Sequence, residues 1–197
     1  MFKNALRAAC VSTASATLLG AIVGLAGPAS ADRVIHRDAR HDVMKVAFAE
    51  AGDELVPAPR VREGDVTRAM IDHRYRRLVV KLRYAELSRD TVRIQIGVLR
   101  TDGGRFALVL FGLPDHGNDV VLFSAEKQLT CKGLWNEVDY RENTIKLSVP
   151  RRCLDNPEWV RVGVGYERLT RRAAYLDDAL SSRVRDNLTM TRRLYRN

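Results

Sequence analysis

Residues 77–84 read Arg-Leu-Val-Val-Lys-Leu-Arg-Tyr, and residues 92–98 read Val-Arg-Ile-Gln-Ile-Gly-Val. In both stretches apolar side chains alternate with polar or small ones, which is the period of a β-strand with one buried face. The same period recurs in residues 160–166, and turn-forming clusters such as residues 114–119 separate the runs. The sequence therefore predicts an all-β protein with the architecture of an antiparallel β-sandwich of the jelly-roll type.

The alternation also predicts which side chains face the core. We expect the apolar set to point inward, namely Leu78, Val80, Leu82, Val92, Ile94, Ile96, Ile145 and Leu147. Basic residues on the same strands would then point outward and could attract polyanions; they are Lys81, Arg83, Arg93, Lys146 and Arg161. The alternative is that interleaved acidic residues neutralise this face and the charge serves only solubility.

The first 31 residues have the three parts of a secretory signal peptide. Lys3 and Arg7 form a basic start, an uncharged apolar stretch covers residues 8–26, and Ala29-Ser30-Ala31 is a cleavage-type motif. An N-terminal membrane anchor is the alternative, but the stretch is rich in small residues and lacks a stop-transfer cluster. We therefore predict a secreted, extracellular protein that could associate with the cell wall. No later stretch is long and apolar enough to span a bilayer, so we expect no transmembrane anchoring.

Cleavage would remove Cys10 and leave Cys131 and Cys153 in an oxidising compartment. If Glu142-Asn143 is a two-residue turn, Tyr140 opposes Ile145 and the extended ladder brings Cys131 within one residue of Cys153. A bulge near Pro150 would absorb the offset, because proline cannot donate to the ladder. We predict a Cys131–Cys153 disulfide, and two free buried thiols are the alternative.

The chain divides into four parts. Residues 1–31 are the expected signal peptide, 32–64 an N-terminal arm with a candidate edge strand, 65–166 the sandwich core and 167–197 a basic C-terminal extension. In the extension, apolar residues recur at three- and four-residue steps, which favours a partly helical segment; a loop with a fraying tail is the alternative. The extension carries eight arginines against four acidic residues.

Few residues indicate chemistry. Asp115, Asn118 and Asp119 lie close together in one loop and form a weak candidate calcium site, although a plain Asx-rich turn explains them equally well. We expect no other cofactor. The sequence contains no nucleophile elbow, phosphate-binding glycine loop or zinc-protease motif, so we expect no catalytic activity; an unrecognised hydrolase is the alternative.

Four segments carry a resemblance to a known group of proteins: residues 65–68, 77–87, 143–150 and 159–165. They resemble the DOMON-like and family-9 carbohydrate-binding-module-like β-sandwiches, and residues 149–165 in particular are similar to small secreted proteins of high-GC Gram-positive bacteria. The resemblance implies a jelly-roll sandwich that binds a sugar, haem or a surface without catalysis. The ligand residues of those families do not carry over, because the sequence shows neither a matched Met/His pair for haem nor a facing tryptophan pair for a sugar.

The chain has 33 basic and 24 acidic residues and a net charge of +9. Together with the predicted export, this charge favours a non-catalytic binding module for carbohydrate or an anionic cell-wall polymer, and we do not expect nucleic acid as the partner. The second hypothesis is a structural or protein-interaction module that docks through a sheet edge or the C-terminal extension.

Overall fold

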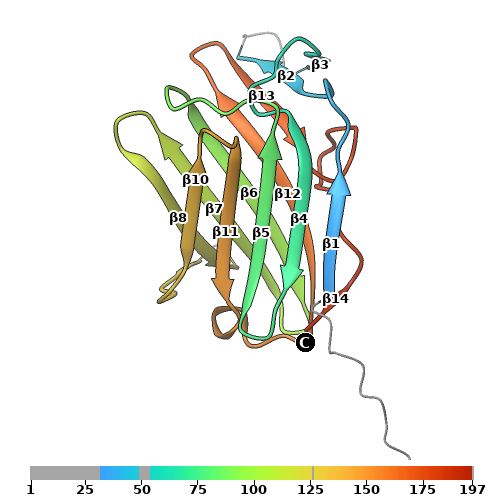
Figure 1. Cartoon of the computed structure of the whole chain (residues 1–197), viewed down its shortest axis with the longest axis vertical. Helices are drawn as coiled ribbons and strands as arrows, with labels where there is room; N and C mark the ends of the chain where they lie inside the picture. The colour runs from blue at the N-terminus through green and yellow to red at the C-terminus, as the bar shows by residue number, and fades with distance from the viewer. Residues whose placement is uncertain (1–31, 49–53, 126, 197) are drawn as a thin grey trace, which may run out of the picture.

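The computed structural model describes residues 32–48, 54–125 and 127–196, so the expected signal peptide lies outside the described residues. One antiparallel sheet contains, in spatial order, β1 (Asp32–Arg37), β4 (Val66–His73), β5 (Arg77–Tyr84), β11 (Thr144–Pro150) and β10 (Trp135–Asp139). It lies in front of the second sheet in Figure 1.

The second sheet is larger and is also antiparallel. Its order is β3 (Leu55–Pro57), β2 (Met44–Ala47), β13 (Ala173–Asp178), β12 (Trp159–Leu169), β6 (Val92–Thr101), β7 (Arg105–Leu113), β8 (Gly117–Ser124) and β9 (Lys127–Leu129). The short β14 (Leu194–Tyr195) pairs with the start of β12, and a 3-10 helix, η1 (Arg151–Leu154), follows β11. The prediction of an antiparallel β-sandwich is confirmed.

The hydrophobic core fills the space between the two sheets. Strand β5 contributes Leu78, Val80 and Leu82, all with 1% exposure or less, and β11 contributes Ile145 and Leu147. Val160, Val162 and Val164 of β12 face them from the larger sheet. The inward orientation predicted for these three strands is therefore confirmed.

Strand β6 has the opposite orientation from the one expected. Arg93, Gln95 and Leu99 point into the sandwich, whereas Ile94 and Ile96 lie half-buried on the outer face of the larger sheet. The register explains the difference, because Leu99 lies opposite the inward Val162 of β12. Gln95 is tolerated inside since its Oε1 accepts a hydrogen bond of 2.8 Å from the Tyr84 hydroxyl of the facing sheet.

The hairpin of β10 and β11 is shifted by two residues from the expected register. Val138, rather than Tyr140, lies opposite Ile145, and Asp139 lies opposite Thr144. The loop therefore has four residues, and the Asp139 carboxylate accepts hydrogen bonds from the backbone N–H groups of Arg141 and Glu142 at 2.9 and 3.0 Å. Because the shift is even, every side chain keeps its predicted face.

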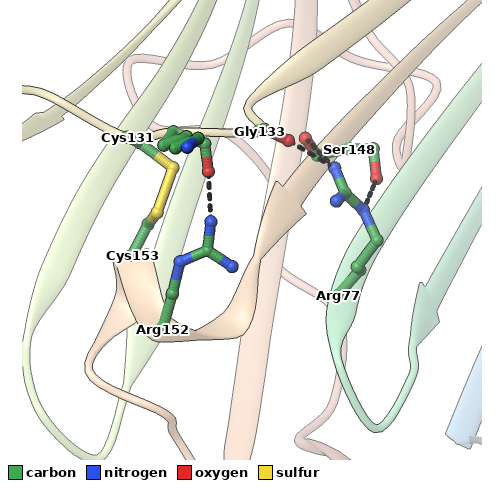
Figure 2. The surroundings of a disulfide bond; sticks show 7 residues. Arg77, Cys131, Gly133, Ser148, Arg152 and Cys153 are labelled. Atoms are coloured by element: carbon green, nitrogen blue, oxygen red, sulfur yellow. Dashed lines mark hydrogen bonds between the residues drawn. A yellow bond between two sulfur atoms is a disulfide. The ribbon is translucent and has the colours of Figure 1, made fainter.

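The predicted disulfide is present (Figure 2), with the Cα atoms of Cys131 and Cys153 5.8 Å apart. The offset in the ladder is absorbed by η1, which carries Cys153, rather than by a bulge at Pro150. Arg77 supports the same region: it donates hydrogen bonds to Ser148 Oγ at 2.6 Å and to the Gly133 carbonyl at 2.7 Å.

Both ends of the described part of the chain belong to the sandwich. Strand β12 continues through the expected boundary at residue 166 and pairs with β13. The described part of residues 167–197 therefore contains strands and an irregular segment, residues 179–193, and no helix where a partly helical extension was expected. Leu194 is fully buried in the core. At the other end, β1 is the edge strand of the smaller sheet, and Arg192 bonds Asp32 at its start with an N–O distance of 2.8 Å.

Candidate functional site

Basic side chains line up across the outer face of the five-stranded sheet. The register places Arg37 of β1 opposite Arg68 of β4, and Arg68 opposite Arg83 of β5. Two residues farther along, Lys81 of β5 lies opposite Lys146 of β11. We call six of the outward cations of this sheet the basic face; they are Arg33, Arg37, Arg68, Lys81, Arg83 and Lys146.

The alternation of the strands produces this face. Ala69 and Ile71 of β4, and Leu82 and Tyr84 of β5, are buried between the sheets, so the residues between them must point outward. Because strands of a sheet lie about 4.8 Å apart, a row of three cations spans about 10 Å. Like charges placed directly opposite each other destabilise a sheet. The basic face is therefore an unfavourable surface unless anions approach it.

A hollow of about 240 Å³ lies on the basic face. Its lining residues are Arg33, Arg68, Met70, Lys81, Arg83, Glu142 and Thr144. A second hollow beside it shares Arg68 and Arg83 and adds Arg37, Arg40 and Arg62. Four cations thus line the first hollow against one carboxylate, which gives it a positive potential.

Most cations of the basic face have no acidic partner. Among the described residues, no carboxylate oxygen lies within 4.0 Å of a basic nitrogen of Arg33, Arg37, Arg68, Lys81 or Arg83. Only Lys146 has one, Glu137, at 3.5 Å. Acidic residues do lie on the same outer face, since the register places Asp72 opposite Arg33 and Glu137 opposite Lys146, but among the described residues only Glu137 forms an ion pair with a cation of the basic face.

One aromatic side chain borders the basic face. Trp135 on the edge strand β10 is 43% exposed, and the Lys146 Nζ lies 4.9 Å from the centre of its ring. A cation over an indole ring is electrostatically favourable. The lysine also covers one surface of the ring, which leaves less of it free for stacking against a sugar.

Two of the five predicted polyanion-binding residues lie elsewhere. Arg93 is 1% exposed inside the sandwich, where its guanidinium donates to the Ser88 carbonyl and the Tyr140 hydroxyl, so a surface role is wrong. Gly112 has no side chain to fill this space, and a Cβ atom at that position would clash with the Arg93 side chain. Arg161 lies on the larger sheet, where its Nε donates to the Thr191 carbonyl at 2.8 Å. Lys81, Arg83 and Lys146 are brought together as predicted, on β5 and β11.

The loop considered for calcium has other contacts. The Asn118 side-chain oxygen accepts from Arg93 at 3.3 Å, and one Asp119 carboxylate oxygen accepts from the Val120 N–H at 2.8 Å. Asp115 is exposed, with a left-handed φ of 65°. The guanidinium next to Asn118 repels a cation, so this loop offers a poor calcium site.

Sequence reasoning missed Arg33, Arg37 and Arg68. The sequence predicts an arm over residues 32–64, whereas the structure shows the edge strand β1 at Asp32–Arg37, with alternating exposure. Arg68 lies between Thr67 and Ala69, in a stretch whose period of two was visible. The sequence does not reveal that Arg68 lies opposite Arg83, because this depends on how β4 and β5 pair. A β-bulge between Val66 and Arg68 shifts the register of that pairing by one residue.

A separate group of side chains could hold a metal ion. Asp38, Asp42 and Asp177 each provide one carboxylate oxygen, and these oxygens all lie within 4.8 Å of one another. Burial, together with the smaller effect of the neighbouring Asp177 carboxylate, raises the pKa of Asp38 to about 8. Burial likewise raises the pKa of Asp177 to about 8.

Comparison with known proteins finds no matching family model, no similar curated protein and no similar solved structure. The described residues include no helix that is long and apolar enough to cross a membrane.

Proposed function

We propose that this protein is an exported, non-catalytic binding module whose basic face holds an anionic polymer of the cell surface. The observation that carries the proposal is the row of Arg37, Arg68 and Arg83 on adjacent strands, which has no acidic partner among the described residues.

Arginine suits this role because its guanidinium group can donate two parallel hydrogen bonds to one phosphate or carboxylate. A row of about 10 Å is longer than a single small anion, so it fits a chain of repeated anionic groups. An anion between Arg68 and Arg83 would also offset their mutual repulsion. The proposed ligand is therefore a polymer with phosphate or carboxylate groups.

Charge explains the surface better than sugar stacking does. Trp135 is at one edge of the basic face, and Lys146 lies against its ring. The first hollow is lined by cations, Met70 and Thr144 and contains no aromatic side chain. A neutral carbohydrate would find few stacking contacts there, whereas an acidic one would meet four cations.

Two observations support export. The disulfide between Cys131 and Cys153 belongs to an oxidising compartment. The leader-like sequence of residues 1–31 has the order of parts that a signal peptide requires. In that setting, cell-wall polymers are the anions that a basic face would meet first.

An apolar surface favours a second candidate function, docking to a protein partner. Strands β6, β7 and β8 place Ile96, Val109 and Val121 opposite one another on the outer face of the larger sheet. Phe111 extends this surface and is 39% exposed. Contiguous apolar patches often mark protein interfaces. We rank this function second because most of these side chains are half-buried, whereas the arginines of the basic face are exposed.

The test is retention of the purified protein on immobilised polyphosphate, polyglutamate and neutral dextran, at low and at high salt. The double variant R68S/R83S removes two adjacent cations from the basic face. R100S/R105S is the matched control, because Arg100 and Arg105 also lie opposite each other and are exposed, but on β6 and β7 of the other sheet.

We expect retention on an anionic polymer that high salt abolishes, and binding at least about tenfold weaker in R68S/R83S, since two charge-assisted hydrogen bonds are lost. The control should bind as the parent does. An equal loss in both double variants would show that net charge alone is responsible. Absence of retention, together with a larger mass in light scattering that Phe111→Asp reduces, would favour the second candidate.

A further inference from the structure

Carboxylates gather between the end of β1 and the start of β2. Asp38 follows β1, Asp42 precedes β2, and Asp177 lies on β13, which pairs with β2. The chain turns sharply between the first two, where His41 adopts a left-handed φ of 68°. Asp65, just before β4, is held to this turn because it accepts a hydrogen bond of 3.1 Å from the His41 N–H.

Backbone hydrogen bonds fix one oxygen of two of these carboxylates and leave the other without a partner. Asp177 Oδ2 accepts from the Val66 N–H at 2.6 Å, and Asp38 Oδ1 accepts from the Ala39 N–H at 3.0 Å. Asp177 Oδ1, Asp38 Oδ2 and both oxygens of Asp42 are buried with no hydrogen-bond donor. Asp65 shows the same arrangement, since its Oδ1 has no donor either.

The side chains that carry these carboxylates are buried. Asp177 is 3% exposed and Asp65 is fully buried, and the side chain of Asp38 is 1% exposed. Among the described residues no lysine or arginine nitrogen lies within 4.0 Å of these carboxylates, and the one basic side chain that does is His36, whose Nε2 lies 3.7 Å from Asp38 Oδ1. Buried anions without a counter-charge are strongly unfavourable in a folded protein.

We propose that Asp38, Asp42 and Asp177 bind a divalent cation, with calcium as the preferred ion and Asp65 as an additional negative charge beside it. One carboxylate oxygen from each of the three residues lies within 4.8 Å of the other two, which allows one ion to contact all three. This site is separate from the basic face, and the inference does not depend on polymer binding.

The donor set indicates the class of ion. All of the converging atoms are carboxylate oxygens, which suit hard cations such as calcium, magnesium or manganese; cysteine sulfur or histidine nitrogen would favour zinc. Calcium accepts irregular geometries and six to eight oxygen ligands, so water and backbone carbonyls can complete its coordination. Magnesium requires a near-ideal octahedron, which three carboxylates from three different segments fit less readily.

The raised pKa values of all four carboxyl groups agree with this assignment. Burial is the largest cause at Asp42 and Asp65 as well as at Asp38 and Asp177, and the pKa of Asp42 is raised further by the nearby Asp65. Without a cation, burial and mutual repulsion favour the protonated form of these carboxyl groups. With a cation, the same groups would be ionised and attracted to it.

The first experiment titrates the purified protein, freed of metal with a chelator, with calcium and then with magnesium in a calorimeter. We expect saturable binding of one calcium ion, weaker binding of magnesium, and a melting temperature that rises with calcium concentration and falls again when EDTA is added. No heat and no change in melting temperature with calcium, magnesium or manganese at millimolar concentration would overturn the proposal.

Asp42→Asn removes one ligand at nearly constant volume. We expect it to weaken calcium binding at least about tenfold, as loss of a metal-site group commonly does, and to leave the metal-free protein as stable as the parent or more so. Asp119→Asn is the matched control, because Asp119 belongs to the other loop considered for calcium. If Asp119→Asn abolished binding while Asp42→Asn preserved it, the site would be in that loop and the proposal would be wrong. Asp38→Asn repeats the test should Asp42→Asn fail to fold.

Discussion

Arg68 lies directly opposite Arg83 in the antiparallel ladder of β4 and β5, and both side chains are exposed. A like-charged pair in this position costs the sheet about 0.2–1 kcal/mol. The two residues therefore weaken the fold at the place where the proposed ligand binds.

Replacing Arg83 with threonine should stabilise the fold and weaken polymer binding at the same time. We expect the free energy of unfolding in urea to rise by about 0.2–1 kcal/mol at low salt, because the repulsion disappears and threonine is favoured in strands. The gain should shrink at high salt, where exposed charges are screened. A lower free energy of unfolding at low salt would contradict this explanation.

Replacing Cys153 with serine should destabilise the oxidised protein. The disulfide closes a loop with a sequence separation of 22 residues, and loss of such a link lowers the free energy of unfolding by about 3 kcal/mol in the chain-entropy model. Denaturant unfolding with and without reductant measures the effect. The reduced parent should match the variant, and equal stability of the two proteins without reductant would show that the link does not stabilise the fold.

The period of two was sufficient to predict the sandwich, but not the orientation of every strand. In β5 and β12 only one set of alternate positions is apolar enough to be buried, so their faces followed from the sequence. In β6, the isoleucines at 94 and 96 resemble core residues more than Gln95 does. Gln95 faces inward nonetheless because Tyr84 of the other sheet donates a hydrogen bond to it, and the sequence does not reveal a partner in another sheet.

The candidate sites were predictable only in part, for a similar reason. Lys81, Arg83 and Lys146 follow from alternation within two strands, whereas their neighbours on β1 follow only from the pairing of β1 with β4. The acidic cluster combines Asp38 and Asp42 with Asp177, far away in the chain. Asp177 lies in a segment whose apolar residues are spaced as in a helix. Strand β13 ends in two buried aspartates, so its sequence does not show the alternation of apolar and polar residues that is typical of a strand.

Truncating Leu194 to alanine tests whether the C-terminal segment belongs to the core. Leu194 is fully buried, so the variant should lose about 2–5 kcal/mol of unfolding free energy, as buried leucine-to-alanine changes do. Tyr195 is the adjacent control, since it is 50% exposed and its alanine variant should unfold nearly as the parent does. Equal stability of the Leu194 variant and the parent in denaturant would mean that the segment is not part of the cooperative unit.

His73 should make the fold sensitive to acid. Its ring is buried, and the Nδ1 atom lies 2.9 Å from the Leu194 carbonyl oxygen, so a neutral ring that donates from Nδ1 fits the site. Burial lowers the pKa of His73, and it outweighs the hydrogen bond to the Leu194 carbonyl, which acts in the opposite direction. The charge of Arg151 also lowers this pKa, whereas Asp102 and Asp32 raise it by smaller amounts.

A histidine whose pKa is lower in the folded protein than in the unfolded chain takes up its proton first in the unfolded chain. The contribution of His73 to the free energy of unfolding should therefore be at its full value above about pH 6.5, the ordinary histidine pKa, and should decrease as the pH falls below it. His73→Gln keeps a hydrogen-bond donor but cannot titrate, so its unfolding free energy should decrease less on the acid side. His116→Gln is the control, because His116 is exposed and its substitution should leave the pH profile unchanged. Parallel profiles for the parent and His73→Gln, measured by denaturant unfolding between about pH 4.5 and 8, would show that His73 is not the group responsible.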